Sequence, residues 1–357
     1  MAKPALTVLA GPAALETLRR DGFDREAFRA MLGASGGAKW LVLGRLDRAI
    51  VDRVVSGRRN PLFLLGSSIG AWRFCCYAQR DPVAALARFE EAYFGQSYSA
   101  KPTPADISAV SRGILEEVVG PDGASEALSH PTLRFSVLVA RARGLMARLP
   151  GRRAQQLGLV AAALANALSR NLLGVFFERV LFHDPRDPPP LRLPDGFPGR
   201  RVPLTPANLV DAVLASGSIP GVLEPVTDIP GAPAGVYQDG GIIDYHFDYP
   251  PSEEGLVLYP HFYPFLVPGW FDKALRWRRV AGRALDRVVL VCPSEAFVAG
   301  LPGGRIPDRH DFVNFDTGER LRRWRTAVDA SERLADEFAE LVDTGRFAQR
   351  ARPFPEG

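Results

Sequence analysis

Ser68 is the residue whose surroundings most suggest chemistry. It stands in Gly66-Ser67-Ser68-Ile69-Gly70, a Gly-x-Ser-x-Gly pattern. The apolar run 61–65 before it is typical of a buried strand, and residues 71–79 after it are typical of a helix. A serine at such a strand-to-helix turn stands clear of the sheet, and the flanking Gly66 and Gly70 leave the room that the turn needs. We therefore expect Ser68 to be a nucleophile that attacks an acyl carbonyl.

A second copy of the pattern surrounds Ser35, in Gly33-Ala34-Ser35-Gly36-Gly37, and it too lies between an apolar run and a helical segment. The pattern alone does not choose between the two serines. The copy around Ser35 is richer in glycine, and consecutive glycines expose backbone N–H groups that can hold an anion. This favours Ser68 as the attacking residue and the loop at Gly36 and Gly37 as an anion cradle.

A serine nucleophile needs a base, and the sequence offers two candidates. Asp239 is followed directly by Gly240 and Gly241, which let the backbone turn sharply at a strand end and present the carboxylate. His246, further along the same segment, would allow a Ser–His–Asp triad. We expect Asp239 to be the base, and the alternatives are an ordinary Asp-Gly turn and a triad through His246.

Several segments, taken in order, resemble the patatin-like phospholipase family. They are the glycine-rich loop at 35–39, the turn at 66–70, the segment Ala215-Ser216-Gly217-Ser218-Ile219-Pro220 and Asp239-Gly240-Gly241. The resemblance spans roughly residues 28 to 245. Two positions depart from it, because the family usually has glycine where this chain has Ser35 and Trp40.

The resemblance implies an α/β protein with a three-layer fold, in which helices cover both faces of a central, mostly parallel sheet. It also implies a lipid acyl hydrolase that uses a Ser68–Asp239 dyad without histidine. Backbone amides of the loop Gly36, Gly37, Ala38 and Lys39 would then form the oxyanion hole, and no cofactor or metal would be needed. Other readings remain open: an acyltransferase or thioesterase with the same dyad, or a lipid-binding protein without turnover.

Apolar runs and helical periodicity along the chain predict the elements that position these residues. Strands are expected at 6–10, 28–32, 61–65, 133–140, 235–238, 255–259 and 287–292, and helices at 13–20, 38–55, 71–79, 154–182 and 318–342. The early alternation of strand and helix indicates an α/β fold with a largely parallel sheet. The proline-rich stretch 183–206 is expected to be extended loop.

We expect one domain over 1–345, with a helical and proline-rich cap-like insertion at about 141–206, and a C-terminal tail at 346–357. Of the 357 residues, 46% are hydrophobic and 24% are charged, which suits a globular protein with a sizeable core. Three cysteines, no secretory leader and no transmembrane stretch lead us to expect a cytoplasmic protein.

The net charge is +4, and arginine carries nearly all of the positive charge, in clusters such as 134–153 and 276–287. No nucleic-acid-binding signature accompanies these clusters, so no nucleic-acid partner is expected. Two apolar or aromatic blocks with neighbouring arginines, 157–182 and 259–277, suit the headgroup boundary of an anionic membrane. The alternatives are buried helices and a solvated basic surface, and we expect at most peripheral membrane contact.

Overall fold

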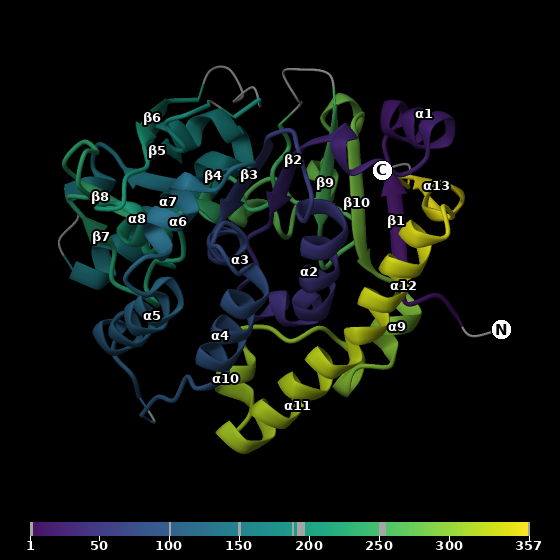
Figure 1. Cartoon of the computed structure of the whole chain (residues 1–357). Helices are drawn as coiled ribbons and strands as arrows, with labels where there is room; N and C mark the ends of the chain where they lie inside the picture. Colours follow the sequence, from purple (N-terminus) through teal and green to yellow (C-terminus); the bar gives the residue numbers. More distant parts are fainter. Residues whose placement is uncertain are drawn as a thin grey trace.

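A single mixed sheet of eleven strands runs through the protein (Figure 1). The computed structural model describes residues 3–99, 101–148, 151–187, 189–190, 197–249 and 255–355. Along the sheet the strand order is β11-β1-β10-β9-β2-β3-β4-β5-β6, and β8 pairs with both β4 and β7. The strands are β1 (Leu6–Ala10), β2 (Phe28–Gly33), β3 (Leu62–Ser67), β4 (Leu133–Ala142), β5 (Phe177–His183), β6 (Gly199–Pro203), β7 (Val226–Thr227), β8 (Val236–Asp239), β9 (Leu256–Pro260), β10 (Val288–Pro293) and β11 (Arg352–Pro353).

The centre of the sheet is parallel, since β10, β9, β2, β3 and β4 all run in the same direction. Antiparallel pairs occur between β1 and β10, between β4 and β5, and between β8 and its neighbours β4 and β7. Every residue of β3, β9 and β10 is buried, so both faces of the central sheet are covered. The predicted α/β class with a mostly parallel sheet is confirmed.

Helices surround this sheet, and α3 packs directly on β2, β3 and β4. In Figure 1, α2, α3, α4 and α11 lie together below the sheet. The helices are α1 (Pro12–Asp21), α2 (Gly44–Ile50), α3 (Ile69–Tyr77), α4 (Pro82–Phe94), α5 (Pro104–Val119), α6 (Gly123–Ser129), α7 (Gly151–Leu168), α8 (Leu209–Ser216), α9 (Glu295–Ala299), α10 (Asp311–Asn314), α11 (Thr317–Ala330), α12 (Glu332–Asp343) and α13 (Phe347–Arg350).

Two helix predictions were wrong. The apolar stretch 154–182 contains α7, a 3₁₀ turn and then β5, which pairs antiparallel with β4. A continuous apolar run does not distinguish a buried strand from a helix, and here pairing with β4 decides. The long helix expected at 318–342 is two helices that meet at Ser331, whose hydroxyl donates to the Val328 carbonyl and accepts from the amide of Arg45.

The segment 141–206 is therefore not purely helical or loop, because β5 and β6 extend the sheet within it. At the other end of the chain, β11 pairs with β1, so part of the expected tail also belongs to the sheet. The division into one domain with a cap-like insertion stays a prediction.

The turn after β3 depends on two close backbone approaches. A Cβ added at Gly70 would lie 2.0 Å from the carbonyl oxygen of Gly33, the last residue of β2. A Cβ at Gly66 would lie 2.4 Å from the Cα of Ala71. Only glycine therefore lets α3 begin against β2 and β3, and this brings the turn at Ser68 and the loop after β2 to the same edge of the sheet.

We predict that Gly70→Ala lowers the free energy of unfolding by at least about 2 kcal/mol, because the added methyl group overlaps the backbone of β2. The matched control is Gly113→Ala in α5, where an added Cβ meets nothing within 4 Å. That change should be neutral or stabilise the protein by up to about 1 kcal/mol, since alanine is the better helix former. Urea denaturation measures both, and equal effects would contradict the close approach.

Candidate active site

Ser68 occupies a strained turn between β3 and α3. Its φ of 53° and ψ of −130° fall in a region that residues with a side chain rarely adopt. The turn is held from outside, because the Ser68 amide donates to Ser216 Oγ at 2.8 Å and Ser216 Oγ donates to the Leu138 carbonyl at 2.7 Å. Strain that the surroundings hold in this way is typical of functional sites.

Asp239 ends β8 and accepts a hydrogen bond from the Ser68 hydroxyl, with 2.7 Å between Ser68 Oγ and Asp239 Oδ2. Its other oxygen, Oδ1, accepts from the Gly241 amide at 2.7 Å. The glycines after it are sterically required. A Cβ at Gly240 would lie 2.2 Å from the Leu138 carbonyl oxygen, and one at Gly241 would lie 2.7 Å from Ser35 Oγ. The turn therefore fixes both oxygens of the carboxylate.

Burial raises the pKa of Asp239 to about 6, although the hydrogen bonds from Ser68 and Gly241 act in the opposite direction. At neutral pH the group is still mainly a carboxylate, but it binds a proton more readily than an ordinary aspartate does. A pKa near the working pH suits a general base that must both take and return a proton.

His246 lies apart from this pair. Its side chain is fully buried, and its Nδ1 accepts from the Val267 amide at 2.9 Å. Its Nε2 has no hydrogen-bond partner among the described residues, and its ring packs against the rings of Tyr245, His261 and Phe262. No hydrogen bond joins His246 to Ser68 or Asp239 in the described part of the chain, so the geometry offers no triad through this residue.

The glycine-rich loop after β2 faces Ser68 across the pocket. Gly36, Gly37 and Lys39 line the cavity, whereas Ala38 is fully buried and does not line it. Gly37 has a φ of 55°, which favours glycine, and a Cβ at Gly36 would lie 2.6 Å from the Phe262 ring. Within the described residues the amides of Gly36 and Gly37 carry no protein acceptor, so they are available to an oxyanion.

Ser35 lies in the same loop but makes different contacts. Its amide donates to the Tyr245 carbonyl at 3.0 Å, and its hydroxyl donates to Ser67 Oγ, also at 3.0 Å. No carboxylate or histidine accepts from this hydroxyl among the described residues. Ser35 therefore stabilises the loop against β3 and has no base beside it.

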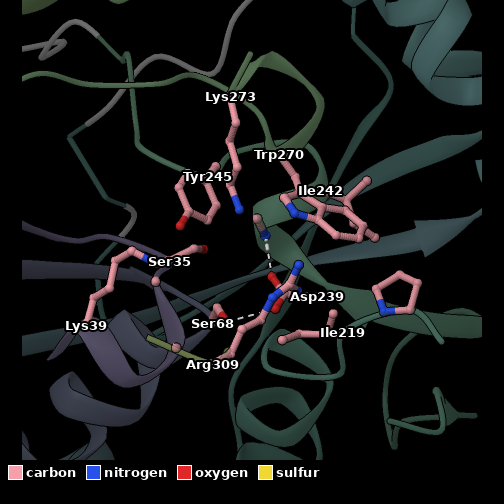
Figure 2. A pocket seen from close by; sticks show the side chains of 14 residues that line it. Ser35, Lys39, Ser68, Ile219, Asp239, Ile242, Tyr245, Trp270, Lys273 and Arg309 are labelled. Atoms are coloured by element: carbon pink, nitrogen blue, oxygen red, sulfur yellow. Dashed lines mark hydrogen bonds between the residues drawn. The ribbon is translucent and has the colours of Figure 1, made fainter. Parts of the chain in front are cut away.

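The pocket over Ser68 holds about 450 Å³, counting the solvent at its mouth (Figure 2). The residues that line it are Ser35, Gly36, Gly37, Lys39, Ser68, Ile219, Pro220, Asp239, Gly241, Ile242, Tyr245, Trp270, Lys273 and Arg309. Nothing in the sequence connects Trp270, Lys273 or Arg309 with Ser68, because they follow the motifs at a distance. Trp270 and Lys273 lie in the aromatic block 259–277, which predicts membrane contact and not a place in this pocket. The sole signal was the rarity of lysine, since Lys39 and Lys273 are two of only four.

Metal ligation finds no support in the described ranges. No group of three or more His, Cys, Asp or Glu side chains there is arranged to hold an ion. The same ranges contain no helix with both the length and the hydropathy to span a bilayer.

Comparison with known proteins gives one family match. A family model described as patatin-like phospholipase matches residues 33–246, which include the loop after β2, the turn at Ser68 and Asp239. No curated protein sequence matches significantly.

Three solved structures match the chain at low sequence identity. Human GIVD cytosolic phospholipase A2 has a TM-score of 0.41 and 12% identity, over 94% of this chain and 61% of that chain. VipD from Legionella pneumophila has a TM-score of 0.35 and 12% identity, over 94% and 71%. The ExoU–SpcU complex of Pseudomonas aeruginosa has a TM-score of 0.34 and 14% identity, over 96% and 54%. The chain thus spans less than two thirds of the human enzyme.

The raised pKa of Asp239 predicts a pH-dependent effect of Asp239→Asn on stability. Because the folded state binds the proton more tightly than the unfolded state, wild-type stability falls as pH rises from about 4 to about 6 and then levels off. The asparagine does not titrate, so the variant should be more stable than wild type by roughly 2 kcal/mol at pH 7.5 and by little at pH 4. Denaturant titrations at both pH values measure the gap, and a gap independent of pH would show that burial does not perturb Asp239.

Proposed function

The chain belongs to the patatin-like phospholipase family, and on that premise we propose that it is a serine hydrolase that cleaves acyl esters of lipids with Ser68 and Asp239. The observation that carries this proposal is the 2.7 Å hydrogen bond from Ser68 Oγ to Asp239 Oδ2 at the base of an open pocket. The strained turn at Ser68 and the amides of Gly36 and Gly37, which have no protein acceptor in the described part, support it.

In the proposed reaction Asp239 takes the hydroxyl proton of Ser68 as Ser68 Oγ bonds to the ester carbonyl carbon. The negative charge moves to the carbonyl oxygen, where the amides of Gly36 and Gly37 donate to it. When the tetrahedral intermediate collapses, the ester C–O bond breaks and protonated Asp239 gives its proton to the leaving alcohol. Asp239 then takes a proton from water as the water oxygen bonds to the acyl carbon. The bond between that carbon and Ser68 Oγ breaks, Asp239 returns the proton to Ser68 Oγ, and the fatty acid leaves.

We predict that Ser68→Ala abolishes both fluorophosphonate labelling and hydrolysis of p-nitrophenyl esters. Asp239→Asn should lower kcat by about 10²-fold or more, because an amide cannot accept the proton. Two variants serve as controls. Ser35→Ala should still be labelled by the fluorophosphonate at Ser68. His246→Ala should keep its esterase activity within about tenfold of the wild type, since neither Ser35 nor His246 contacts the pair.

The reverse pattern, in which activity depends on Ser35 or His246 and survives Ser68→Ala, would contradict this assignment. Product analysis with added alcohols separates the hydrolase from an acyltransferase, because an acceptor that competes with water gives a new ester.

The proposal extends to peripheral contact with an anionic membrane, through an exposed apolar surface made by α7 and the 3₁₀ turn η8 (Arg276–Arg278). On α7, Leu157 is 72%, Leu164 65% and Leu168 82% exposed, and on η8 Trp277 is 77% exposed. Globular proteins seldom expose so many large apolar side chains together. Positive charge accompanies them, because the stretches 142–177 and 273–285 contain arginine or lysine and no acidic residue. We call these four side chains the α7 surface.

The α7 surface adjoins the pocket wall. Asp272, between the pocket residues Trp270 and Lys273, accepts from Asn166 Nδ2 of α7 at 2.7 Å. Arg278 donates to the carbonyls of Asn166 at 2.6 Å and Ala167 at 2.8 Å, and it pairs with Asp272. Arg278 is thus a structural link between η8 and α7 rather than a free membrane ligand, whereas Arg276 and Arg279 are exposed.

We predict that replacing Leu157, Leu164 and Leu168 together with Gln lowers binding to phosphatidylglycerol vesicles by at least about 100-fold, because each inserted leucine contributes about 1.5 kcal/mol or more. High salt should weaken the binding of the wild type, since arginines near the surface contribute as well.

The control is Val83→Gln, which alters an exposed apolar residue on α4, outside the α7 surface. Vesicle sedimentation measures binding, and hydrolysis of a soluble ester checks that the triple variant is folded. Equal sedimentation of the triple variant and wild type would rule out docking through α7.

A further inference from the structure

The pocket over Ser68 carries more positive than negative charge. Lys39, Lys273 and Arg309 line it, and Asp239 is the sole carboxylate that does so. Within the described ranges no carboxylate oxygen lies within 4.0 Å of the charged nitrogens of these three side chains. Other arginines of the described chain also lack an ion pair, and what distinguishes these three cations is that they line one pocket.

The neighbouring carboxylates have other partners. Asp239 accepts hydrogen bonds from Ser68 and Gly241, and in the proposed reaction its negative charge is needed to take the proton of Ser68. Asp308, which adjoins the pocket, accepts from the His310 amide at 2.7 Å and lies 3.9 Å from Arg305. Both carboxylates attract Lys273, but neither forms an ion pair with Lys273 or Arg309, so positive charge in the pocket remains available to a ligand.

Aromatic rings hold Lys273 and Arg309 in place. Lys273 Nζ lies 3.9 Å from the centroid of the Tyr245 ring and 5.7 Å from that of Trp270. The guanidinium carbon of Arg309 also lies 5.7 Å from the Trp270 centroid. Figure 2 shows the amino group of Lys273 pointing into the pocket from the upper edge and Arg309 entering from below. Contacts of this kind orient a cation without neutralising it.

The arrangement is electrostatically unfavourable in the absence of an anion. The Lys273 side chain is exposed, but its amino group lies against the Tyr245 ring and near Trp270. Desolvation, followed by repulsion from Lys39 and Arg309, lowers the pKa of Lys273 to about 7. A negatively charged group placed between these side chains would relieve the repulsion, and the gain would appear as binding affinity.

We propose that Lys273 and Arg309 bind an anionic group of the substrate, a phosphate or a carboxylate, that is covalently attached close to the scissile ester. This inference rests on the proposed function for the identity of the reacting ester. Both residues lie outside residues 33–246, so they belong to a part of the chain that the family model does not match. They would select substrates, whereas Ser68 and Asp239 perform the reaction.

The test compares soluble esters that differ in one anionic group. The carboxylate arm uses 4-nitrophenyl hydrogen glutarate against its neutral methyl ester. The phosphate arm uses a monomeric short-chain phosphatidic acid against the diacylglycerol with the same acyl chains. Wild type should prefer the anionic member in at least one arm, and the arm in which it does so identifies the group. The preference should shrink as ionic strength rises.

Lys273→Met and Arg309→Gln should each raise KM for the preferred anionic ester about tenfold or more, as expected for loss of a charge-assisted hydrogen bond. Both variants should leave kcat and KM for the neutral ester within about threefold. Lys273→Arg should restore most of the preference, because it restores the charge. The matched control is Arg279→Gln, an exposed arginine from the same segment that lies over the Phe265 ring and outside the pocket.

A fall in kcat on both esters would overturn the proposal, because the cations would then act on the transition state. Equal rates for anionic and neutral esters in the wild type would overturn it as well. Binding is checked without turnover by calorimetric titration of Ser68→Ala with glycerol 3-phosphate and with glutarate. Binding heat that is present in Ser68→Ala and lost in Ser68→Ala/Lys273→Met supports the anion subsite even if no ester is cleaved. If neither glycerol 3-phosphate nor glutarate gives binding heat with Ser68→Ala, the subsite is contradicted. If the proposed function alone were wrong, esterase activity would survive Ser68→Ala.

Discussion

The site depends on the register of β4, because two adjacent residues of this strand position both members of the Ser68–Asp239 pair. Leu138 pairs with Ser67 of β3, directly before the turn, and Val139 pairs with Asp239 of β8. The Leu138 carbonyl also accepts from Ser216 Oγ, which holds the Ser68 amide. A shift of either neighbour by one residue would turn its side chains to the opposite face of the sheet. The 2.7 Å hydrogen bond is therefore a consequence of strand pairing.

Burial of this hydrogen bond determines what the pair can do. In water an aspartate is a weak base toward a serine hydroxyl, because its pKa lies near 4. Desolvation raises the pKa of Asp239 to about 6, and the Gly241 amide keeps the carboxylate oriented while it does so. A histidine supplies a similar pKa without burial. Here His246 is instead packed against the rings of Tyr245, His261 and Phe262, where burial lowers its pKa well below the usual value and keeps it neutral.

The sequence predicted the parts of the site that are encoded locally. Gly66, Gly70 and Gly240 are required by backbone approaches, and Gly241 lies against the side chains of Ser35 and Asp239. Such requirements leave a recognisable pattern around Ser68 and Asp239. The sequence predicted less where pairing between segments that are distant in sequence determines the structure. The apolar run around β5 was interpreted as helix, because the pairing with β4 that makes it a strand is remote in sequence. Lys273 and Arg309 could not be found for the same reason, since folding alone brings them to Ser68.

In the proposed reaction, the residues after β8 supply what the Ser68–Asp239 pair alone lacks, a means of selecting among esters. Serine attack and oxyanion binding act on atoms that all acyl esters share, so they contribute little to the choice of substrate. Differences between esters lie beyond the carbonyl, and there the wall is formed by Trp270, Lys273 and Arg309. The Asp272 carboxylate ties this wall to α7 through Asn166 and to the following 3₁₀ turn through Arg170. Asp272 therefore connects the surface that we propose for docking with the wall that we propose for substrate selection.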